Sequence, residues 1–279
     1  MAQSTGKVWF LTGTSKGFGR IWAEAALERG DRVVATARDV ETVRELEQKY
    51  GDRALALALD VTDKAAVGAA VARTLERFGR IDIAVNNAGY GQFGMVEELS
   101  EAEARAQMET NLFGALWVTQ AVLPHMRAQK SGHIIQVSSI GGINAFPAIG
   151  MYHASKWALE GISQSLAQEV ASFGIHVTLV EPAGYSTDWS GPSAKHATPI
   201  SAYDPVREAR AKARSAAVPG DPDATGPAIL KVVDAEKPPL RIFFGTTGLP
   251  MTKTEYASRI SLWEEWNGVS TEAQGQPKN

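Results

Sequence analysis

The sequence of 279 residues contains no cysteine. This absence excludes disulfide bonds, thiolate-bound zinc, iron–sulfur clusters and a cysteine nucleophile. The sequence also lacks a large excess of charge of either sign. It contains 28 Lys and Arg residues and 31 Asp and Glu residues, so the formal net charge is −3. We therefore expect no nucleic acid partner, because nucleic-acid binders usually carry a basic patch and have a high isoelectric point.

Long apolar runs are missing as well. No stretch approaches the roughly 20 apolar residues of a membrane-spanning helix, and residues 1–7 contain no apolar segment typical of a signal peptide. We expect a cytoplasmic protein with no membrane partner. The five histidines show neither His-x-x-x-His nor His-Glu-x-x-His spacing, so we predict no metal site.

The sequence does contain a regular alternation of short apolar runs and segments with helical periodicity. Most apolar runs are continuous, as in strands that are buried on both faces of a parallel sheet. The expected strands are Val8–Leu11, Arg32–Thr36, Ala54–Leu59, Ile81–Asn86, His133–Ser138, His176–Val180 and Arg241–Phe244. The expected helices are Gly19–Arg29, Val40–Tyr50, Lys64–Phe78, Glu101–Arg127, Met151–Phe173 and Ala224–Val233. This pattern predicts an α/β fold in one domain over residues 1–279, with a doubly wound parallel sheet of about seven strands and helices on both faces.

Residues 182–223 interrupt the alternation. The segment is rich in Ala, Pro and Ser and contains Tyr185, Trp189 and Tyr203. Connections without regular structure that exceed about 12–15 residues are usually lids, binding loops or disordered inserts. We predict a substrate lid here, with a solvated insertion as the alternative. Further on, we expect the aromatic segment Tyr256–Trp266 to pack on the body or on a neighbouring subunit, and residues 271–279 to form a flexible tail.

A glycine-rich turn follows the first expected strand and leads into a helix. It spans Thr12–Gly19 and has the spacing Gly-x-x-x-Gly-x-Gly. Glycines allow a tight turn and let the backbone approach a pyrophosphate at the helix N-terminus. The position after the first strand of an α/β pattern, more than the glycines themselves, predicts a dinucleotide site.

This spacing resembles that of the compact branch of the short-chain dehydrogenase/reductase family. Three further signatures follow in the family's order: Asp60-Val61 after the third strand, Asn86-Asn87-Ala88-Gly89 after the fourth, and Pro182-Ala183-Gly184 with Thr187 after the sixth. Ala183 stands where the family usually has glycine. The resemblance implies a Rossmann-like sheet with the strand order 3-2-1-4-5-6-7.

The resemblance also implies a nicotinamide dinucleotide cofactor. The residues that it assigns to cofactor binding are Gly13, Ser15, Lys16, Gly17, Phe18, Gly19, Arg38, Asp60, Val61, Asn87, Ala88, Gly89, Tyr152, Lys156, Pro182, Gly184 and Thr187. Ala37 stands where an acidic residue would select NAD, and Lys16 and Arg38 resemble the NADP-preferring members. Cations suit a ribose 2′-phosphate, so we predict NADP (NADPH); the alternative is that both cations are solvated and that Asp39 pairs with Arg38.

Tyr152 and Lys156 lie four residues apart and therefore on one face of the expected helix. Ser139, at the end of the fifth strand, strengthens this pair, because ligands bind at the carboxyl ends of parallel strands. A free tyrosine has a pKa near 10. We expect Lys156 and an oxidised nicotinamide to lower it, so that Tyr152 acts as acid/base while Ser139 hydrogen-bonds the substrate oxygen. By resemblance, Lys156 binds the nicotinamide ribose and Asn111 holds a proton-relaying water; the alternative for Asn111 is a local hydrogen bond in its helix.

The predicted function is hydride transfer between NADP(H) and a mainly apolar ketone or secondary alcohol. Candidate pocket residues, several of which core packing would explain equally well, are Gln92, Phe93, Met95, Ile140, Ile143, Phe146, Tyr185 and Trp189. The alternatives are an NAD-dependent alcohol dehydrogenase, a member of the longer epimerase and dehydratase branch, and a catalytically silent NADP-binding redox sensor. By analogy we expect a homodimer or homotetramer formed through the long helices, with Trp117 and Trp157 either at the interface or in the core.

Overall fold

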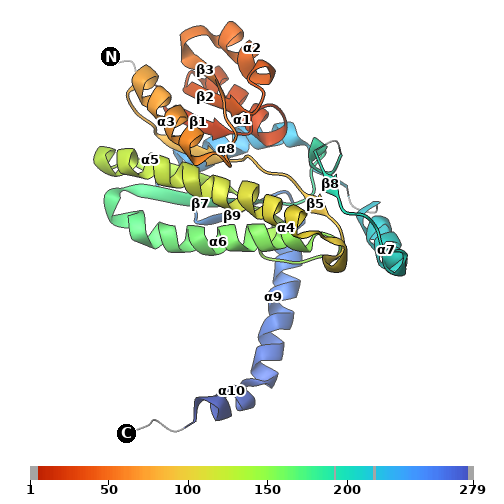
Figure 1. The fold of residues 1–279 in the computed structure, drawn as a ribbon. Coiled ribbons are helices and arrows are strands. Elements are labelled where there is room, and N and C mark those ends of the chain that lie inside the picture. Colours follow the sequence, from red (N-terminus) through yellow and green to blue (C-terminus); the bar gives the residue numbers. More distant parts are fainter. Residues whose placement is uncertain (1–5, 192, 216–217, 276–279) are drawn as a thin grey trace.

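The computed structural model describes residues 6–191, 193–215 and 218–275. A sheet of seven parallel strands in the order β3-β2-β1-β4-β6-β7-β9 forms its centre (Figure 1). The strands are β1 (Val8–Thr12), β2 (Arg32–Ala37), β3 (Ala54–Ala58), β4 (Ile83–Asn86), β6 (Gly132–Val137), β7 (Ile175–Pro182) and β9 (Arg241–Phe244). The Rossmann-like fold and its strand order are confirmed, because β6, β7 and β9 are the fifth to seventh strands of this sheet.

Helices cover both faces of the sheet (Figure 1). One face packs against α3 (Lys64–Phe78), α5 (Ala115–Gln129) and α6 (Gly150–Val170). The other packs against α1 (Gly17–Arg29), α2 (Glu41–Tyr50) and α8 (Thr225–Asp234). This double cover explains why the strands read as continuous apolar runs in the sequence.

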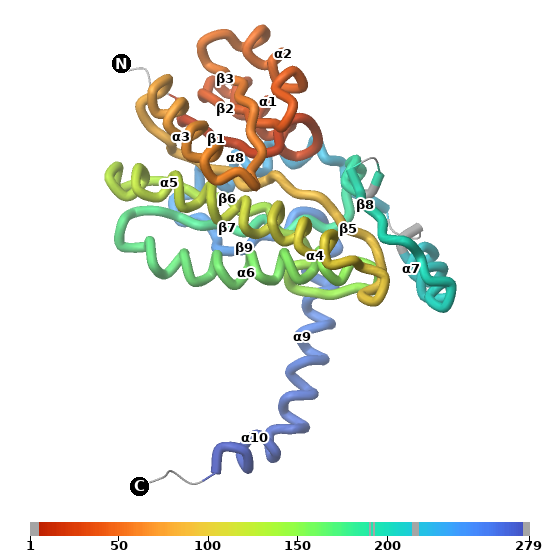
Figure 2. The backbone as a smooth tube through the Cα atoms, viewed as in Figure 1, coloured from red at the N-terminus to blue at the C-terminus, as the bar shows by residue number. Residues whose placement is uncertain are grey.

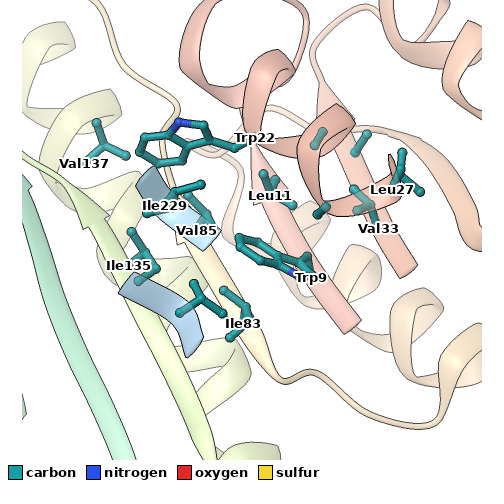
Figure 3. Packing of buried hydrophobic residues seen from close by; sticks show 14 of the residues in the cluster. Trp9, Leu11, Trp22, Leu27, Val33, Ile83, Val85, Ile135, Val137 and Ile229 are labelled. Carbon is teal, nitrogen blue, oxygen red and sulfur yellow. The ribbon is translucent and has the colours of Figure 1, made fainter. Parts of the chain in front are cut away.

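Strand β1 lies at the centre of both cores, and all five of its residues are buried. Trp9 and Leu11 point to the α1 and α8 face, where they pack in one cluster with Trp22 and Ile229 (Figure 3). Phe10 points the opposite way and packs against the α3 and α5 face. The alternation of a strand thus places neighbouring residues in two separate cores.

The predicted helix Glu101–Arg127 is interrupted. Between α4 (Glu101–Met108) and α5, the segment Glu109–Gly114 is a π-helix. Such widened turns inside helices are frequent at functional sites. This one carries Asn111, whose side chain bonds to residues outside its own helix. Apolar periodicity could not reveal the interruption, because the apolar residues continue through it.

The insertion 182–223 contains more regular structure than its composition suggests. Strand β8 (Lys195–His196) pairs with β5 (Gln92–Phe93) in a parallel two-stranded sheet, and α7 (Asp204–Ser215) lies at the side of the body (Figure 1). The helix α7 is so polar that no apolar stripe marked it in the sequence. An ion pair between Arg207 Nη1 and Glu98 Oε1 (2.6 Å) holds it in place.

The C-terminal region extends away from the body (Figure 1). Helix α9 (Gly248–Glu265) leaves the body beyond β9, and α10 (Asn267–Gln274) follows it (Figures 1 and 2). We call residues Gly248–Gln274 the C-terminal arm. Most of the aromatic segment Tyr256–Trp266 is exposed in this arm instead of packed on the body. The tail that we predicted to be flexible, residues 271–279, is helical as far as Gln274. Within this helix, Thr271 Oγ1 donates to the backbone oxygen of Asn267 (3.0 Å). Residues 276–279 lie outside the described part.

None of the helices in the described residues is long and apolar enough to cross a membrane.

Candidate active site

The parallel sheet gathers the predicted site residues at one edge. Because neighbouring strands all pair in parallel, their carboxyl ends lie along the same edge. The residues that come at these ends are Gly13 after β1, Arg38 after β2, Asp60 after β3, Asn87 after β4, Ser139 after β6 and Pro182 at the end of β7. Stretches that are far apart in the sequence thus share one edge of the sheet.

The glycine-rich turn has the geometry of a phosphate cradle. Gly13 and Gly17 have φ values of +69° and +59°, which side-chain-bearing residues rarely adopt. A Cβ on Gly19 would lie 2.3 Å from the backbone oxygen of Gly13, so glycine is needed for α1 to pack this closely on β1. Lys16 provides no side-chain cap to α1. The backbone N–H groups in the first turn of α1 are therefore available to an anion. The glycine-rich turn thus fits the pyrophosphate of a dinucleotide.

Asn87 braces this turn. Its Nδ2 donates to the backbone oxygens of Thr12 (3.0 Å) and Gly13 (2.8 Å). Thr12 Oγ1 in turn accepts from the backbone N–H groups of Asn87 and Ala88, at 3.0 Å each. The side chain predicted to contact the cofactor thus positions the turn. A Cβ on Gly89 would lie 3.0 Å from Asn111 Oδ1, so this backbone also passes close to the π-helical segment.

The ends of β2 and β3 carry the residues expected at the adenosine. Arg38 is exposed, and its charge partly offsets the burial that raises the pKa of Tyr90. Asp39 Oδ1 accepts from the N–H of Glu41 (3.1 Å), and among the described residues it forms no ion pair with Arg38. Asp60 Oδ1 accepts from the N–H (2.9 Å) and hydroxyl (2.7 Å) of Thr62.

Val61, next to Asp60, is buried, and a Cβ on Gly114 would lie 2.5 Å from its Cγ2. It therefore packs against the π-helical segment.

Lys16, in the glycine-rich turn, forms an ion pair with Asp188. Its Nζ lies 3.3 Å from Asp188 Oδ2, which belongs to the insertion 182–223, and both side chains are about half exposed. Neighbouring Ser15 is exposed. Phe18 stacks on Trp22 with the ring planes 7° apart. An anion bound at Lys16 would compete with Asp188.

The segment after β7 is tied to β9 and to the end of the insertion. Ala183 N–H donates to the oxygen of Phe244 (2.9 Å), and Gly184 accepts from the N–H of Gly220 (2.9 Å). Pro182 is buried, Gly184 is exposed and Thr187 is half-buried. Ala183, which stands where the family usually has glycine, thus forms an ordinary backbone hydrogen bond to β9.

Three residues with acid/base and hydrogen-bonding side chains come together where β6 ends. Tyr152 and Lys156 lie on adjoining turns of α6, and both are buried. Lys156 Nζ donates to the backbone oxygen of Val137 (2.7 Å) and lies 5.8 Å from the centre of the Tyr152 ring. Ser139 Oγ accepts from the N–H of Gly141 (2.9 Å), which fixes it at the strand end.

Asn111 is bound to distant residues and not to its own helix. Its Nδ2 donates to the oxygen of Tyr90 and to Ser155 Oγ, both at 3.1 Å, and its Oδ1 accepts from the N–H of Tyr90 (3.1 Å). Ser155 Oγ then donates to the backbone oxygen of Tyr152 (2.7 Å). This chain of bonds joins the π-helical segment to the turn of α6 that carries Tyr152. The alternative of a local hydrogen bond is wrong.

The pKa of Tyr152 is shifted upward by the protein's own groups. Burial raises it to about 12, and a hydrogen bond with Ser139 offsets only part of this effect. Burial also lowers the pKa of Lys156 to about 8, against the opposing charge of Glu160. Desolvation of the buried phenol acts against the lowering that we expect from Lys156 and an oxidised nicotinamide.

An aromatic side chain of the insertion covers Tyr152. The Trp189 ring lies 4.8 Å from the Tyr152 ring and 5.4 Å from that of Phe93, measured between centroids. A Cβ on Gly91 would lie 2.7 Å from Trp189, so glycine is required beneath the indole. Phe93 also stacks on His196 of β8 at 5.1 Å. Of the predicted pocket residues, Trp189 therefore packs against the tyrosine, and Phe93 packs against Trp189.

The other predicted pocket residues have different surroundings. Gln92, Met95, Ile140 and Ile143 are buried. Phe146 packs on His153 at 5.4 Å between ring centroids.

Tyr185 does not join this group. It lies edge-on to Phe18 at 5.1 Å and lines a hollow of about 440 Å³ between α8 and β9. A parallel β-bridge joins Tyr185 to Gly220, near the end of the insertion.

Sequence reasoning missed His153. Its Nε2 accepts from the N–H of Phe146 (2.8 Å), and its Nδ1 lies 2.8 Å from the oxygen of Gly141. Both nitrogens are thus used to hold the loop between β6 and α6. Its place beside Tyr152 in the sequence gave no signal of this role.

Sequence reasoning also missed a buried charge cluster of Glu160, Glu181 and Arg241. Arg241 Nε lies 2.8 Å from Glu160 Oε2 and 3.5 Å from Glu181 Oε1. Burial, followed by the charge of Glu160, raises the pKa of Glu181 to about 8. The spacing of four residues between Lys156 and Glu160 could have suggested the first member.

Residues 7–198 match the family model described as short chain dehydrogenase. The chain is 44% identical over 259 residues to oxidoreductase BOA17 of Botryotinia fuckeliana, covering 91% of this chain and 93% of that protein. It is also 34% identical to 3-ketodihydrosphingosine reductase of Bacteroides thetaiotaomicron, covering 91% and 97% of the two chains.

Solved structures resemble the whole chain. A short-chain dehydrogenase from Streptomyces avermitilis is 40% identical with a TM-score of 0.89, covering 96% of this chain and 99% of that one. A metagenomic short-chain oxidoreductase in complex with NADP is 30% identical with a TM-score of 0.69, covering 86% and 97%.

Proposed function

Because the chain belongs to the short-chain dehydrogenase family, we propose that it transfers a hydride between NADP(H) and a mainly apolar ketone or secondary alcohol, with Tyr152 as the acid/base. The observation that carries this proposal is the group of Ser139, Tyr152 and Lys156 where β6 ends, at the same edge of the sheet as the glycine-rich turn. When bound, the nicotinamide supplies or accepts the hydride.

Tyr152 is set to donate a proton. Because its pKa is raised to about 12, the phenol keeps its proton at neutral pH and can give it to a ketone oxygen as negative charge develops there. The Ser139 hydroxyl offers that oxygen a hydrogen bond. The Lys156 ammonium, close to the ring, stabilises the tyrosinate that remains. The arrangement favours carbonyl reduction.

The chain's own groups also fit the cofactor. The pyrophosphate would lie at the first turn of α1, and Lys16 and Arg38 would face a 2′-phosphate. The ammonium of Lys156 has three donors and spends one on Val137, so donors remain for the nicotinamide ribose. The NADP complex of the metagenomic relative supports the same cofactor class.

The substrate class follows from the surroundings of Tyr152. The Trp189 ring packs against the Tyr152 ring, with the centroids 4.8 Å apart. Phe93 lies on Trp189, at 5.4 Å between centroids. Apolar and aromatic walls with a few polar groups suit an apolar carbonyl compound. The name of the Bacteroides relative, a reductase of a keto compound, agrees with this class.

The test follows NADPH oxidation with a panel of aliphatic, cyclic and aromatic ketones. Tyr152→Phe keeps the ring and deletes the proton donor, so kcat should fall by about 10²–10⁴-fold. Tyr50→Phe, a remote half-buried tyrosine on α2, serves as the matched control and should retain full activity.

Each other outcome rejects part of the proposal. Full activity in Tyr152→Phe removes the acid/base assignment. NADPH binding without turnover of any ketone favours a redox sensor, and faster turnover with NADH favours an NAD-dependent dehydrogenase.

A further inference from the structure

Two buried carboxyl groups lie close to the candidate active site and have no part in the proposed reaction. Glu160 is on α6, one turn after Lys156, and Glu181 is on β7. Both glutamates are buried. Carboxylates are almost never fully buried unless a cation or hydrogen bonds compensate for the lost water. The position of this pair beside a buried lysine therefore needs an explanation.

Glu160 reaches the same end of β6 as Lys156. Residues four apart on a helix lie on one face, and Lys156 Nζ donates to the backbone oxygen of Val137 (2.7 Å). A Cβ on Gly142 would lie 2.5 Å from Oγ of the next residue, Ser138, and 3.2 Å from Glu160 Oε1. The Glu160 carboxyl and the Lys156 ammonium thus both lie at the carboxyl end of β6.

The contacts of the two glutamates favour a charge on Glu160 and a proton on Glu181. Arg241 Nε hydrogen-bonds Glu160 Oε2 at 2.8 Å but lies 3.5 Å from Glu181 Oε1. Among the described residues, neither oxygen of Glu181 has a hydrogen-bond partner. A buried carboxylate without donors is disfavoured, whereas a hydrogen bond from a cation favours the charged form, and two carboxyls that share a site resist double ionisation. Glu181 is therefore the member that holds a proton at neutral pH.

The pKa values agree with this division. Burial, followed by the charge of Glu160, raises the pKa of Glu181 to about 8. Burial also raises the pKa of Glu160, but the Ser138 hydroxyl and the charge of Arg241 offset part of that effect. In return, the charge of Glu160 raises the pKa of Lys156 against the burial that lowers it to about 8.

The titratable groups around Lys156 and Glu160 come from three elements. Lys156 faces Tyr152 and Glu160 on its own helix. Glu160 in turn faces Glu181 of β7 and Arg241 of β9. Of these groups, Glu160 is the one whose negative charge acts on the lysine.

We propose that the Glu160 carboxylate is the counter-charge of Lys156, and that Glu181 carries the proton of the carboxyl pair. Glu160 is then a positioning residue that acts through Lys156, because it keeps the lysine protonated inside the buried site. This role rests on the proposed function, in which the Lys156 ammonium stabilises the tyrosinate that remains when Tyr152 gives up its proton. A neutral lysine could not do so, and the reduction therefore depends on Glu160.

The experiment follows the titration of Lys156 by NMR in the full chain labelled with ¹³C at lysine Cε. An ordinary lysine titrates near pH 10.4, so the signal that titrates near pH 8 is assigned to Lys156 by its absence from Lys156→Arg. In Glu160→Gln its midpoint should fall by about one pH unit, because an adjacent opposite charge is lost. Glu181→Gln, which mimics the protonated glutamate, is the matched control and should leave the midpoint in place.

The pH profile of ketone reduction connects this titration to the reaction. With the midpoint one unit lower, the protonated fraction of Lys156 at pH 8 falls from about a half to about a tenth. In Glu160→Gln, kcat/KM should therefore drop about fivefold at pH 8 and by much less at pH 6. Glu181→Gln should keep the wild-type profile. A loss of packing alone would lower kcat/KM alike at both pH values.

A further measurement requires no change at Glu160. With ¹³C at glutamate Cδ, one carboxyl of the wild type should titrate near pH 8 and be absent from Glu181→Gln. If this signal persists in Glu181→Gln, Glu160 holds the proton and the proposal is wrong.

An unchanged Lys156 midpoint in Glu160→Gln, or an equal shift in Glu181→Gln, also overturns the proposal. The NMR titrations need no turnover, so they separate this proposal from the proposed function. If the midpoint shifts as expected while kcat/KM stays flat from pH 6 to pH 9, Glu160 is the counter-charge and the role given to Lys156 in the reaction is rejected.

Discussion

Arg241 is the cation that holds two buried carboxylates together, and its replacement by methionine should destabilise the fold in a pH-dependent way. Its Nε lies 2.8 Å from Glu160 and 3.5 Å from Glu181. The two glutamates are only 5% and 1% exposed. Methionine keeps an unbranched apolar stem but leaves Glu181 without a cation beside it, while Glu160 keeps only the charge of Lys156.

The magnitude follows from the burial of the partners. Removing one member of a buried ion pair costs about 3–5 kcal/mol, because the opposite charge stays buried and uncompensated. About a third of the Arg241 side chain is exposed, so water already screens part of the interaction. We therefore expect Arg241→Met to lower the free energy of unfolding by about 3 kcal/mol above pH 8.

The sign of the pH dependence follows from Glu181. Burial and the neighbouring Glu160 raise its pKa to about 8, far above the usual value near 4.3. Between these values the folded chain binds a proton that the unfolded chain has released. The stability contributed by this group is fully present below about pH 4.3 and is lost as the pH rises to about 8. Without Arg241 both carboxyls protonate more readily, so the loss in the variant should shrink to roughly 1 kcal/mol at about pH 5.5.

The assay is urea unfolding followed by tryptophan fluorescence at about pH 5.5, 7 and 8.5, at one protein concentration. Arg44→Met is the control, since Arg44 and Glu41 form an exposed pair that should contribute less than about 0.5 kcal/mol. An equal loss at all three pH values, or no loss above pH 8, would refute the account of a charge-compensating arginine.

Three further predictions concern activity. Arg38→Ala should raise KM for NADPH at least tenfold more than KM for NADH, about 1.4 kcal/mol of selective binding; equal effects on both would remove Arg38 from the 2′-phosphate site. With a pKa of Lys156 near 8, kcat/KM for ketone reduction should fall as the pH rises through about 8, and a flat profile from pH 7 to 9 would contradict a role for its charge. Trp189→Ala should admit water to Tyr152, lower the tyrosine pKa from about 12 toward 10 and change KM for bulky ketones; steady-state kinetics that match the wild type would place Trp189 outside the substrate path.

The sheet could be predicted because its signals are local. Each strand of the seven-stranded sheet contains a short apolar run, and these runs are mostly continuous because helices cover both faces of the sheet. The helix Lys64–Phe78 was predicted with its observed ends, because Asp63 caps its start and Gly79 ends it in a left-handed conformation. The polar helix α7 gave no such signal, since an ion pair to Glu98 holds it and no apolar stripe does.

The direction of the C-terminal arm could not be predicted from the sequence either. Its aromatic residues were recognised as contact residues, but a single chain does not show whether they meet its own body or another copy. That these residues are exposed along α9 becomes visible only once the helix is placed in space.

The same distinction between local signals and distant contacts applies to the residues of the candidate site. The spacing of Gly13, Gly17 and Gly19, and that of Tyr152 and Lys156, is set within one turn or one helix, so the sequence displays it. Contacts between distant segments do not appear in this way. The bracing amide of Asn87 and the cluster of Glu160, Glu181 and Arg241 arise from strands and helices that meet only in the fold.

The protonation of Tyr152 shows why such contacts decide the chemistry. From the sequence, two positive charges near the phenol argue for a lowered pKa. In the structure the phenol is buried, and this burial raises the pKa of Tyr152 to about 12; the charge of an oxidised nicotinamide would act in the opposite direction. In the proposed reaction, a phenol that keeps its proton can give it to a carbonyl oxygen. Trp189, whose ring lies 4.8 Å from the Tyr152 ring between centroids, comes from the insertion, so we expect the insertion to contribute to the burial of the phenol.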